Sequence, residues 1–270
     1  MDEAVKAVVL AGGQGRRLRP YTSVLPKPLM PLGDRAIVEV IVERLVEAGI
    51  RDITLCVGYL AHLIEAVLEG RPRDARITYV YEEHALGTAG PLRLVGGLDG
   101  TFLVMNGDLL TDLRFEDLVA LHRRAGNVVT IATHERRHVA NYGVLETTPG
   151  ESPRLVAYHE KPETSLTVSM GVYVMEPEVL ERIPASGYFD FPQLVQQLLD
   201  EGERVGTMAF AGSWFDIGRQ DDYELALDYW HRTEGGSADV VPPSISDELS
   251  TDLEPASRST AGLFTGQSAT

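Results

Sequence analysis

Apolar runs alternate with amphipathic segments along the first half of the chain. The run from Lys6 to Leu10 predicts a buried strand, and the runs ITLCVGY, ITYVY and FLVMNGD predict three more. Between them, apolar residues recur at helical spacing, first in a segment that Gly49 ends and then in HLIEAVLEG and FEDLVALHRRAG. A short helix is expected near Pro91, and NVVTIATH returns to a strand pattern. This order predicts an α/β fold with a mostly parallel sheet and helices on both faces.

The pattern changes after residue 140. YGVLE, RLVAYHEKP and VSMGVYVMEP predict strands with shorter connections. DFPQLVQQLLDEG predicts a helix capped by Asp190, VGTMAF a strand, and QDDYELALDYWHR a last helix. Residues 233–270 are acidic, rich in Ser, Pro and Thr, and without sustained periodicity. We therefore expect one folded domain over residues 1–232 and a disordered tail over 233–270.

Composition and charge exclude several classes of function. The chain has 270 residues, of which 44% are hydrophobic, so it can bury a sizeable core. Its formal net charge of −16 argues against a nucleic-acid or anionic-membrane partner, because both require a basic surface. The sequence contains neither an apolar run of about 20 residues nor a secretory signal. The single cysteine, Cys56, is expected to be buried and inert, and it fits a cytoplasmic protein.

One loop departs from this acidic balance. The stretch AGGQGRRLRPYTSVLPKP, residues 11–28, follows the first strand and gathers three arginines and a lysine. A glycine-rich loop lets backbone N–H groups approach phosphate oxygens, and the cations add attraction for a triphosphate. The spacing matches neither the G-x-G-x-x-G fingerprint nor the P-loop, which argues against a Rossmann oxidoreductase. We interpret the loop as another kind of phosphate site; a solvated basic loop is the alternative.

The stretch LAGGQGRRLRP…LPKPLMPLG resembles the signature of sugar-1-phosphate nucleotidylyltransferases. EEHALGTAGPL, FLVMNGD, YGVLE, HEKP, SMGVYVM and WFDIG follow in that family's order, so the resemblance covers about residues 4–230. It implies the nucleotide-diphospho-sugar transferase fold, a Rossmann-like sheet flanked by helices, with a smaller mixed part that binds the sugar. The implied enzyme joins a sugar 1-phosphate to the α-phosphate of a nucleoside triphosphate and releases pyrophosphate.

The resemblance assigns four catalytic side chains. Arg17 aligns with the arginine that holds the leaving pyrophosphate, and Lys27 with the lysine near the α- and β-phosphates. Asp108 and Asp216 align with the two aspartates that bind Mg²⁺, and a carboxylate at the end of a strand suits that ion. On local sequence alone, a capping role explains Asp108 equally well. A structural polar group is the more common explanation for an aspartate in the position of Asp216. Asp112 is expected to cap the following helix.

The resemblance also implies two groups of binding residues. Arg16 stands where the family usually has threonine, and we expect its side chain to point outward. The expected nucleotide-binding residues are Leu10, Ala11, Gly12, Gly13, Gly15, Arg16, Glu82, Gly87 and Thr88. The expected sugar-phosphate-binding residues are Gly143, Glu160, Lys161, Gly171 and Val172.

The segment EEHALGTAGPL is expected to face the base. Guanine presents N1–H and N2–H₂ donors, and Glu82, Glu83 or main-chain oxygens are candidate acceptors. The segment looks most like that of mannose-1-phosphate guanylyltransferases, so GTP and mannose 1-phosphate, or a related hexose or heptose phosphate, are expected first. The same reaction with ATP, UTP or dTTP, or on a cyclitol phosphate such as valienol 1-phosphate, stays open, as does a homodimer. The third reading is a non-catalytic regulator that binds nucleotide sugars, against which the four catalytic side chains argue.

Overall fold

The computed structural model describes residues 4–69 and 74–234. The chain divides into two compact units. The described part of the first comprises residues 4–69, 74–136 and 165–234, and that of the second comprises residues 137–164. Helix α5 (Gln220–Glu234) ends the described chain, so the tail expected over 233–270 lies, beyond its first two residues, outside the described residues.

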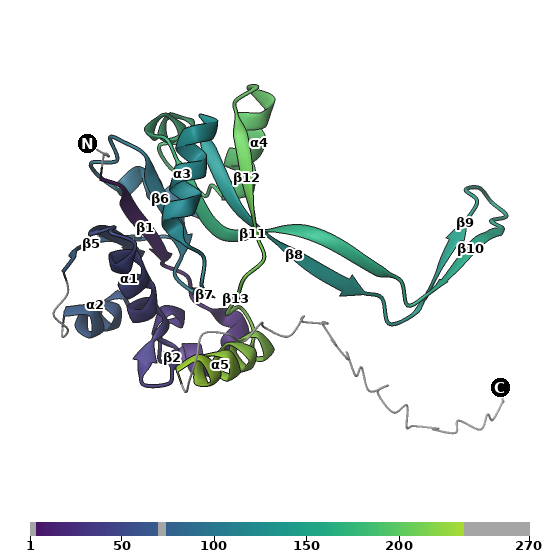
Figure 1. The fold of residues 1–270 in the computed structure, drawn as a ribbon, viewed down its shortest axis with the longest axis horizontal. Coiled ribbons are helices and arrows are strands. Elements are labelled where there is room, and N and C mark those ends of the chain that lie inside the picture. The colour runs from purple at the N-terminus through teal and green to yellow at the C-terminus, as the bar shows by residue number, and fades with distance from the viewer. Residues whose placement is uncertain (1–3, 70–73, 235–270) are drawn as a thin grey trace, which may run out of the picture. The chain divides into compact units, whose positions relative to one another are not determined.

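A seven-stranded sheet forms the centre of the first unit, in the order β12–β8–β11–β6–β1–β4–β5 (Figure 1). β1 pairs in parallel with both β4 and β6, β4 with β5, and β12 with β8, whereas β11 is antiparallel to β6. The mostly parallel sheet expected from the sequence is confirmed. The strand bounds are β1 Lys6–Ala11, β4 Asp52–Val57, β5 Arg76–Tyr81, β6 Phe102–Asn106, β8 Val129–Val139, β11 Glu163–Met175 and β12 Val205–Phe210.

Helices flank this sheet where the sequence has helical apolar spacing (Figure 1). The short helix expected near Pro91 is a 3-10 helix, Gly90–Leu94. Gly49, with a φ of 79°, follows the first helix in the left-handed conformation that glycine adopts readily. The remaining helices are α1 Ile37–Glu47, α2 Ala61–Glu69, α3 Phe115–Ala125 and α4 Phe191–Asp200.

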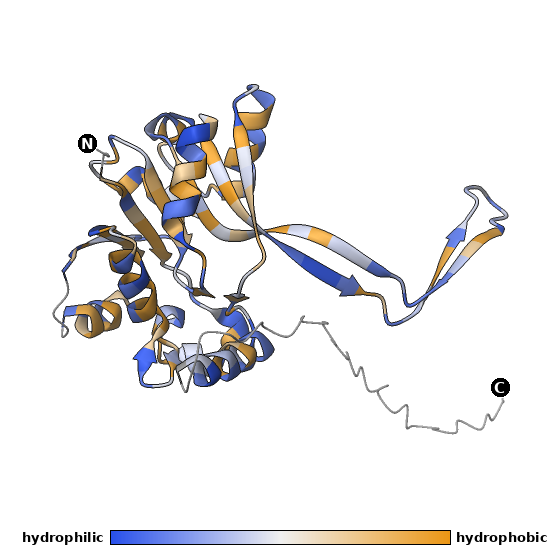
Figure 2. Cartoon of the chain, in the orientation of Figure 1, coloured by the Kyte–Doolittle hydropathy of each residue, from blue (hydrophilic) through white to orange (hydrophobic). Residues whose placement is uncertain are grey.

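The core lies between the sheet and its helices. Apolar side chains dominate the central strands β1 and β6, as expected for strands buried on both faces (Figure 2). Helix α4 buries Phe191 there, with its ring stacked on that of Tyr173 at a centroid distance of 4.2 Å. Cys56 is fully buried, and burial raises the pKa of its thiol to about 12, so the thiol is inert as expected.

Two short ribbons accompany the main sheet in the first unit. β7 (Leu109–Thr111) pairs antiparallel with β13 (Trp214–Asp216), and β2 (Pro31–Leu32) pairs with β3 (Arg35–Ala36). The β7–β13 ribbon contains Asp216, and Asp108 directly precedes β7; the family resemblance assigns both aspartates to catalysis. None of the helices in the described part of the chain is both long and apolar enough to span a lipid bilayer.

The second unit is an antiparallel ribbon of β9 (Gly143–Thr147) and β10 (Leu155–Glu160), with a bulge between Leu155 and Ala157. Both strands were expected from YGVLE and RLVAYHE. Arg137 pairs with Glu163 at 3.6 Å, close to the two ends of this unit.

Candidate active site

The basic loop after β1 is a compact series of turns. Three 3-10 helices, Arg16–Leu18, Tyr21–Ser23 and Lys27–Leu29, succeed one another. Gly15 has a φ of 58°, and a Cβ there would lie 2.9 Å from Cγ2 of buried Thr22. The Thr22 hydroxyl donates to the Gly15 carbonyl at 2.7 Å. Glycine is therefore required at position 15. The turn fixes the backbone position from which the side chains of Arg16 and Arg17 extend.

The two arginines of this loop have different surroundings. Arg16 is exposed, and its Nε donates to Gln14 Oε1 at 3.0 Å. Arg17 is also exposed, but it reaches toward the second half of the chain: a Cβ on Gly218 would lie 3.6 Å from Arg17 Nη2 and 3.5 Å from Asp216 Oδ1. Arg17 and Asp216 thus converge beside Gly218.

Lys27 and the two aspartates form the charged centre of the site. Lys27 Nζ pairs with Asp108 Oδ2 and lies 4.0 Å from Asp216 Oδ1. Asp108 Oδ1 is buried and has no hydrogen-bond partner among the described residues. Burial raises the pKa of the Asp108 carboxyl; the Lys27 charge opposes this effect and the Asp216 charge adds to it. Lys27 therefore lies between two carboxylates, and the buried Oδ1 of Asp108 is left without a hydrogen bond.

The β7–β13 ribbon places the two carboxylates together. Asp108 lies between β6 and β7, and Asp216 at the end of β13 is opposite Leu109 in the ribbon. The Ile217 N–H donates to the Asp108 carbonyl at 3.1 Å. Gly107 N–H donates to the Leu10 carbonyl at 2.9 Å, which ties the carboxyl ends of β6 and β1. Ligands of open α/β sheets bind at this end of the strands.

Asp112 closes the same ribbon, and the expectation that it caps the following helix is wrong. Its Oδ1 accepts the Ser213 N–H at 2.7 Å, and the Thr111 hydroxyl donates to the Ser213 carbonyl at 2.8 Å. Arg114 occupies the N-cap position of α3 instead. The partner of Asp112 is the N–H of Ser213, which directly precedes β13 and is far from Asp112 in the sequence, so a local helix-cap pattern cannot indicate it.

The two aspartates fit a hard divalent cation. Mg²⁺ is commonly bound by one or two carboxylates together with phosphate oxygens and water. The unsatisfied, buried Oδ1 of Asp108 is an oxygen available to such an ion. Within residues 4–69 and 74–234 there is no group of three or more His, Cys, Asp or Glu side chains placed to hold a metal. The protein thus offers two carboxylates. A cation held by only two carboxylates would keep coordination positions for the phosphate oxygens of a substrate.

Glu82 lies against the glycine loop from the end of β5. A Cβ on Gly12 would collide with Glu82 Oε1, so glycine at position 12 is what admits this carboxylate. Glu82 Oε2 accepts the Leu86 N–H at 3.3 Å. Burial raises the pKa of the half-buried Glu82 carboxyl, and the Leu86 N–H partly opposes it.

The predicted sugar-phosphate residues fall in both units. In the first, Gly171 has a φ of 73°, and a Cβ there would lie 2.5 Å from Asn106 Nδ2, at the strand end that leads to Asp108. Val172 is opposite Met105 of β6.

Gly143, Glu160 and Lys161 belong to the second unit. Gly143 is opposite Glu160 across the ribbon, and the Tyr158 hydroxyl donates to Glu160 Oε2 at 2.9 Å. Lys161 has a positive φ of 43°.

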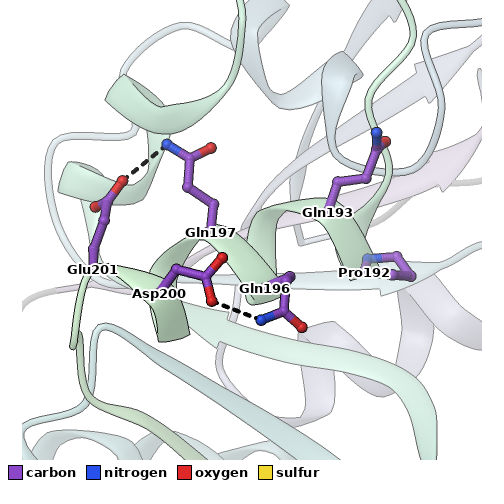
Figure 3. Close-up of a pocket in the computed structure, with 6 residues that line it drawn as sticks. All are labelled: Pro192, Gln193, Gln196, Gln197, Asp200 and Glu201. Carbon is purple, nitrogen blue, oxygen red and sulfur yellow. Dashed lines mark hydrogen bonds between the residues drawn. The ribbon is translucent and has the colours of Figure 1, made fainter.

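Two hollows in the surface are lined by other residues. One lies along α4, where the side chains form a polar helix face: Gln196 Nε2 donates to Asp200 at 2.8 Å and Gln197 Nε2 to Glu201 at 2.9 Å (Figure 3). The other, of about 400 Å³, lies between α1, β7 and α5 and is lined in part by Arg44 and Trp230. Neither is lined by Arg17, Lys27, Asp108 or Asp216.

Comparison with known proteins identifies the family of this chain. A sequence profile of the Nucleotidyl transferase family matches residues 6–231, and the chain belongs to this family. The resemblance expected from the sequence is thereby confirmed.

Relatives within the family differ in the nucleotide that their names give. A mannose-1-phosphate guanyltransferase of Aspergillus fumigatus is 33% identical over 227 residues, which are 81% of this chain and 62% of that protein. A UTP–glucose-1-phosphate uridylyltransferase of Synechocystis is 33% identical over 244 residues, 83% of this chain and 62% of that protein. The chain thus spans less than two thirds of the length of either relative.

A solved structure shows the same fold. HddC from Yersinia pseudotuberculosis, complexed with GMP-PN, superposes with a TM-score of 0.65 at 21% identity and covers 84% of this chain and 99% of its own. The nucleotide-diphospho-sugar transferase fold expected from the sequence is confirmed.

Proposed function

We propose that this protein transfers a nucleotidyl group from a nucleoside triphosphate to a sugar 1-phosphate. The convergence of Arg17, Lys27, Asp108 and Asp216 at the carboxyl ends of β1 and β6, in a member of the Nucleotidyl transferase family, carries this proposal. A phosphate oxygen of the sugar 1-phosphate attacks the α-phosphorus. The new P–O bond forms as the bond to the bridging oxygen of the β-phosphate breaks, and pyrophosphate leaves.

The protein's part in this reaction is alignment and neutralisation of charge. Arg17 is exposed and presents a guanidinium that can bind two pyrophosphate oxygens at once. Lys27 already lies beside two carboxylates, so its ammonium is held next to the place where a phosphate would enter. Lys27 then lowers the electrostatic repulsion between the α-phosphate and the attacking phosphate oxygen of the sugar 1-phosphate.

Asp108 and Asp216 would hold a divalent cation, for which we propose Mg²⁺. The family is generally dependent on a divalent metal. A bound cation supplies positive charge to the triphosphate. The chain contributes the two carboxylates and the β7–β13 ribbon that keeps them adjacent.

For the acceptor we propose mannose 1-phosphate or a related hexose or heptose phosphate. In the second unit, Lys161 is assigned to its phosphate, Glu160 to its hydroxyls, and Gly143 to sugar binding. In the first unit, Gly171 and Val172 are the candidate binding residues. The Tyr158–Glu160 hydrogen bond supports a fixed orientation of the Glu160 carboxylate. The buried, single Cys56 supports a reducing cytoplasm as the place of action.

Pyrophosphate release tests the reaction class. Purified protein with Mg²⁺ is mixed with GTP, ATP, UTP, CTP or dTTP and a panel of sugar 1-phosphates. We expect release that requires both substrates. Release without an acceptor, or none with any pair, would overturn the proposal.

GTP is the nucleotide that the base segment favours. A carboxylate only accepts hydrogen bonds, and guanine is the base with two adjacent donors, N1–H and N2–H₂. Glu82 offers such a carboxylate at the glycine loop, with Oε2 engaged by Leu86 and Oε1 facing Gly12. The names of the guanyltransferase relative and of the GMP-PN complex support this choice, and the uridylyltransferase relative makes UTP the second candidate.

Glu82→Gln tests the choice of GTP. The amide replaces one acceptor face by a donor, so the variant is expected to raise KM for GTP by about tenfold or more, because a mismatched buried partner costs roughly 1–3 kcal/mol. The exposed neighbour Glu83 provides the control, Glu83→Gln, which should leave KM for GTP unchanged. An effect of Glu83→Gln alone would show that the wrong glutamate was chosen.

A further inference from the structure

The segment EEHALGTAGPL, residues 82–92, is the base segment, because it is proposed to receive the nucleotide base. Backbone hydrogen bonds join it to Phe189, about one hundred residues further along the chain. Phe189 N–H donates to the Leu86 carbonyl at 2.8 Å, and the Phe189 carbonyl accepts the Ala89 and Gly90 N–H groups at 3.0 and 2.9 Å. Gly87 has a φ of 86°, and a Cβ there would lie 2.5 Å from the Phe189 carbonyl oxygen. The two backbones are in direct contact, and glycine at position 87 makes that contact sterically possible.

Asp190 adds a side-chain clamp to this backbone pairing. Its Oδ1 accepts both the backbone N–H of Thr88, at 2.8 Å, and the Thr88 hydroxyl, at 3.0 Å. The same hydroxyl accepts the Phe191 N–H at 2.9 Å. The Tyr188 hydroxyl also bonds the Asp190 carboxylate, which raises the pKa of that phenol. Thr88 is thus held on its backbone and on its side chain.

The Asp190 end of the clamp is firmly anchored. Asp190 is the N-cap of α4, and its backbone N–H donates to Gln193 Oε1 at 2.8 Å. The next residue, Phe191, is 3% exposed and stacks on Tyr173 in the core. In the segment from Leu86 to Gly90, Ala89 is buried in the same core, whereas Thr88 is exposed and is hydrogen-bonded to Asp190 and Phe191. The hydrogen bonds from the start of α4 therefore restrict the conformation of the base segment around Thr88.

We propose that Asp190 is a positioning residue for the nucleotide: through Thr88 it sets the conformation of the segment that receives the base. This inference rests on the proposed function, because it takes residues 82–90 as the base site. Asp190 acts on nucleotide affinity, and it has no part in binding the sugar phosphate or in the transfer step. The competing explanation is that Asp190 serves α4 alone, as an ordinary N-cap.

A pair of substitutions separates positioning from capping. Asp190→Ala removes the acceptor of Thr88, whereas Gln193→Ala removes the other half of the α4 cap and leaves Thr88 in place. We expect Asp190→Ala to raise KM for GTP by about tenfold, the effect of losing charge-assisted hydrogen bonds, with kcat and KM for mannose 1-phosphate within about twofold. Gln193→Ala should leave all three unchanged. Asp190→Asn, whose amide oxygen accepts both bonds, should restore most of the affinity.

Equal KM values for GTP in Asp190→Ala and Gln193→Ala would overturn the proposal. If Asp190→Ala does not fold, Thr88→Val removes the hydroxyl from the other side of the clamp but keeps the backbone N–H bond to Asp190, so it should raise KM for GTP by a smaller factor. An unchanged KM for GTP in Thr88→Val would overturn the proposal.

Hydrogen–deuterium exchange without ligand makes the test independent of turnover. The amides of Thr88, Ala89 and Gly90 should exchange faster in Asp190→Ala than in the wild type, and at the wild-type rate in Gln193→Ala. A wild type that releases no pyrophosphate would contradict the proposed function, while the exchange rates would still decide whether Asp190 fixes this segment.

Discussion

At the scale of single residues, the candidate site holds two carboxylates, those of Asp108 and Asp216, close to each other. The charge of Asp216 raises the pKa of the Asp108 carboxyl, and the charge of Lys27 lowers it. Desolvation is the largest effect on Asp108, and the Lys27 charge does not fully cancel it. The proposed binding of a cation and phosphates at this centre therefore comes at the expense of the stability of the ligand-free chain.

Asp108→Asn tests this trade-off. A raised pKa means that the folded chain binds the Asp108 proton more tightly than the unfolded chain does, so ionisation costs folding free energy. The cost is absent below the ordinary pKa of 3.8 and fully present above the raised folded-state pKa. At pH 7 the uncharged variant should therefore raise Tm by about 2–4 °C, the shift that roughly 1 kcal/mol produces in a chain of this size. Activity should be lost.

Thermal unfolding followed at several pH values is the measurement for Asp108→Asn. The difference in Tm between variant and wild type should shrink as the pH falls toward the ordinary pKa of an aspartate. A variant that unfolds at a lower temperature than the wild type at pH 7 would contradict this account of Asp108.

Arg17 and Arg19 form a matched pair in the basic loop. Both are exposed and carry the same charge, but the Arg17 guanidinium lies beside Gly218 and Asp216. Arg17→Ala should lower kcat/KM by about 100-fold or more, because a phosphate clamp of this kind typically contributes several kcal/mol to the transition state. Arg19→Ala should change it by less than about threefold, since a screened surface charge contributes little.

Steady-state kinetics of both arginine variants, with Tm as a check on folding, decide the matter. Equal losses in the two variants would indicate a general attraction for the triphosphate, with no specific role for Arg17.

Resemblance to the family, and not the local pattern alone, assigned the four catalytic residues. Arg17, Lys27, Asp108 and Asp216 each stand in a short recognisable stretch, and the structure brings the four together. Asp190 was read from its sequence as a helix cap, and its contact with Thr88 did not follow, because that contact joins segments far apart in the chain. Nothing periodic or compositional marks such a pair.

At the scale of elements, long periodic segments were predictable and short ribbons were not. The main strands and the five α-helices of the described chain follow apolar runs or helical spacing in the sequence. β7 and β13 have three residues each, too few for a periodic pattern, yet they place the two carboxylates. Their pairing depends on Asp112, Thr111 and Ser213, contacts that only the folded chain reveals.

Helix α3 is joined to the sheet through a buried histidine, which predicts a pH dependence of stability. His122 is fully buried; its Nδ1 is 2.8 Å from Thr130 Oγ1 and its Nε2 is 3.0 Å from Glu176 Oε1. Burial lowers the pKa of His122 although Glu176 opposes the shift. The unfolded chain therefore binds more protons between the lowered pKa and the ordinary value of 6.5. The free energy of unfolding should fall as the pH decreases through that window, and stay intact above 6.5.

Denaturant unfolding of His122→Gln at pH 5–7 checks this dependence. The variant lacks the titrating group, so its free energy of unfolding should vary less with pH than that of the wild type. Exposed His62 on α2 provides the control, His62→Gln, which should keep the wild-type slope. An unchanged slope in His122→Gln would show that other groups dominate acid destabilisation.

At the scale of the whole molecule, the sequence predicted the strands of the second unit but not their separation. β8 has 11 residues and β11 has 13. The last residues of β8, the first residues of β11 and the chain between them form the second unit, residues 137–164. A two-stranded ribbon is marginally stable in isolation, and apolar alternation within it is the same as in a strand of the main sheet. The length of a strand past the edge of its sheet is set by tertiary contacts, which the local pattern does not contain.

Phosphorus NMR of a single reaction mixture tests the central claim most directly. Wild-type protein is incubated with Mg²⁺, GTP and mannose 1-phosphate, and Asp108→Asn is incubated in parallel. We expect the phosphomonoester signal of the sugar phosphate to be replaced by a pyrophosphodiester pair, with inorganic pyrophosphate formed in equal amount. The spectrum of the variant mixture should not change. Inorganic phosphate or GDP as the product, or pyrophosphate without a pyrophosphodiester, would contradict the proposed reaction.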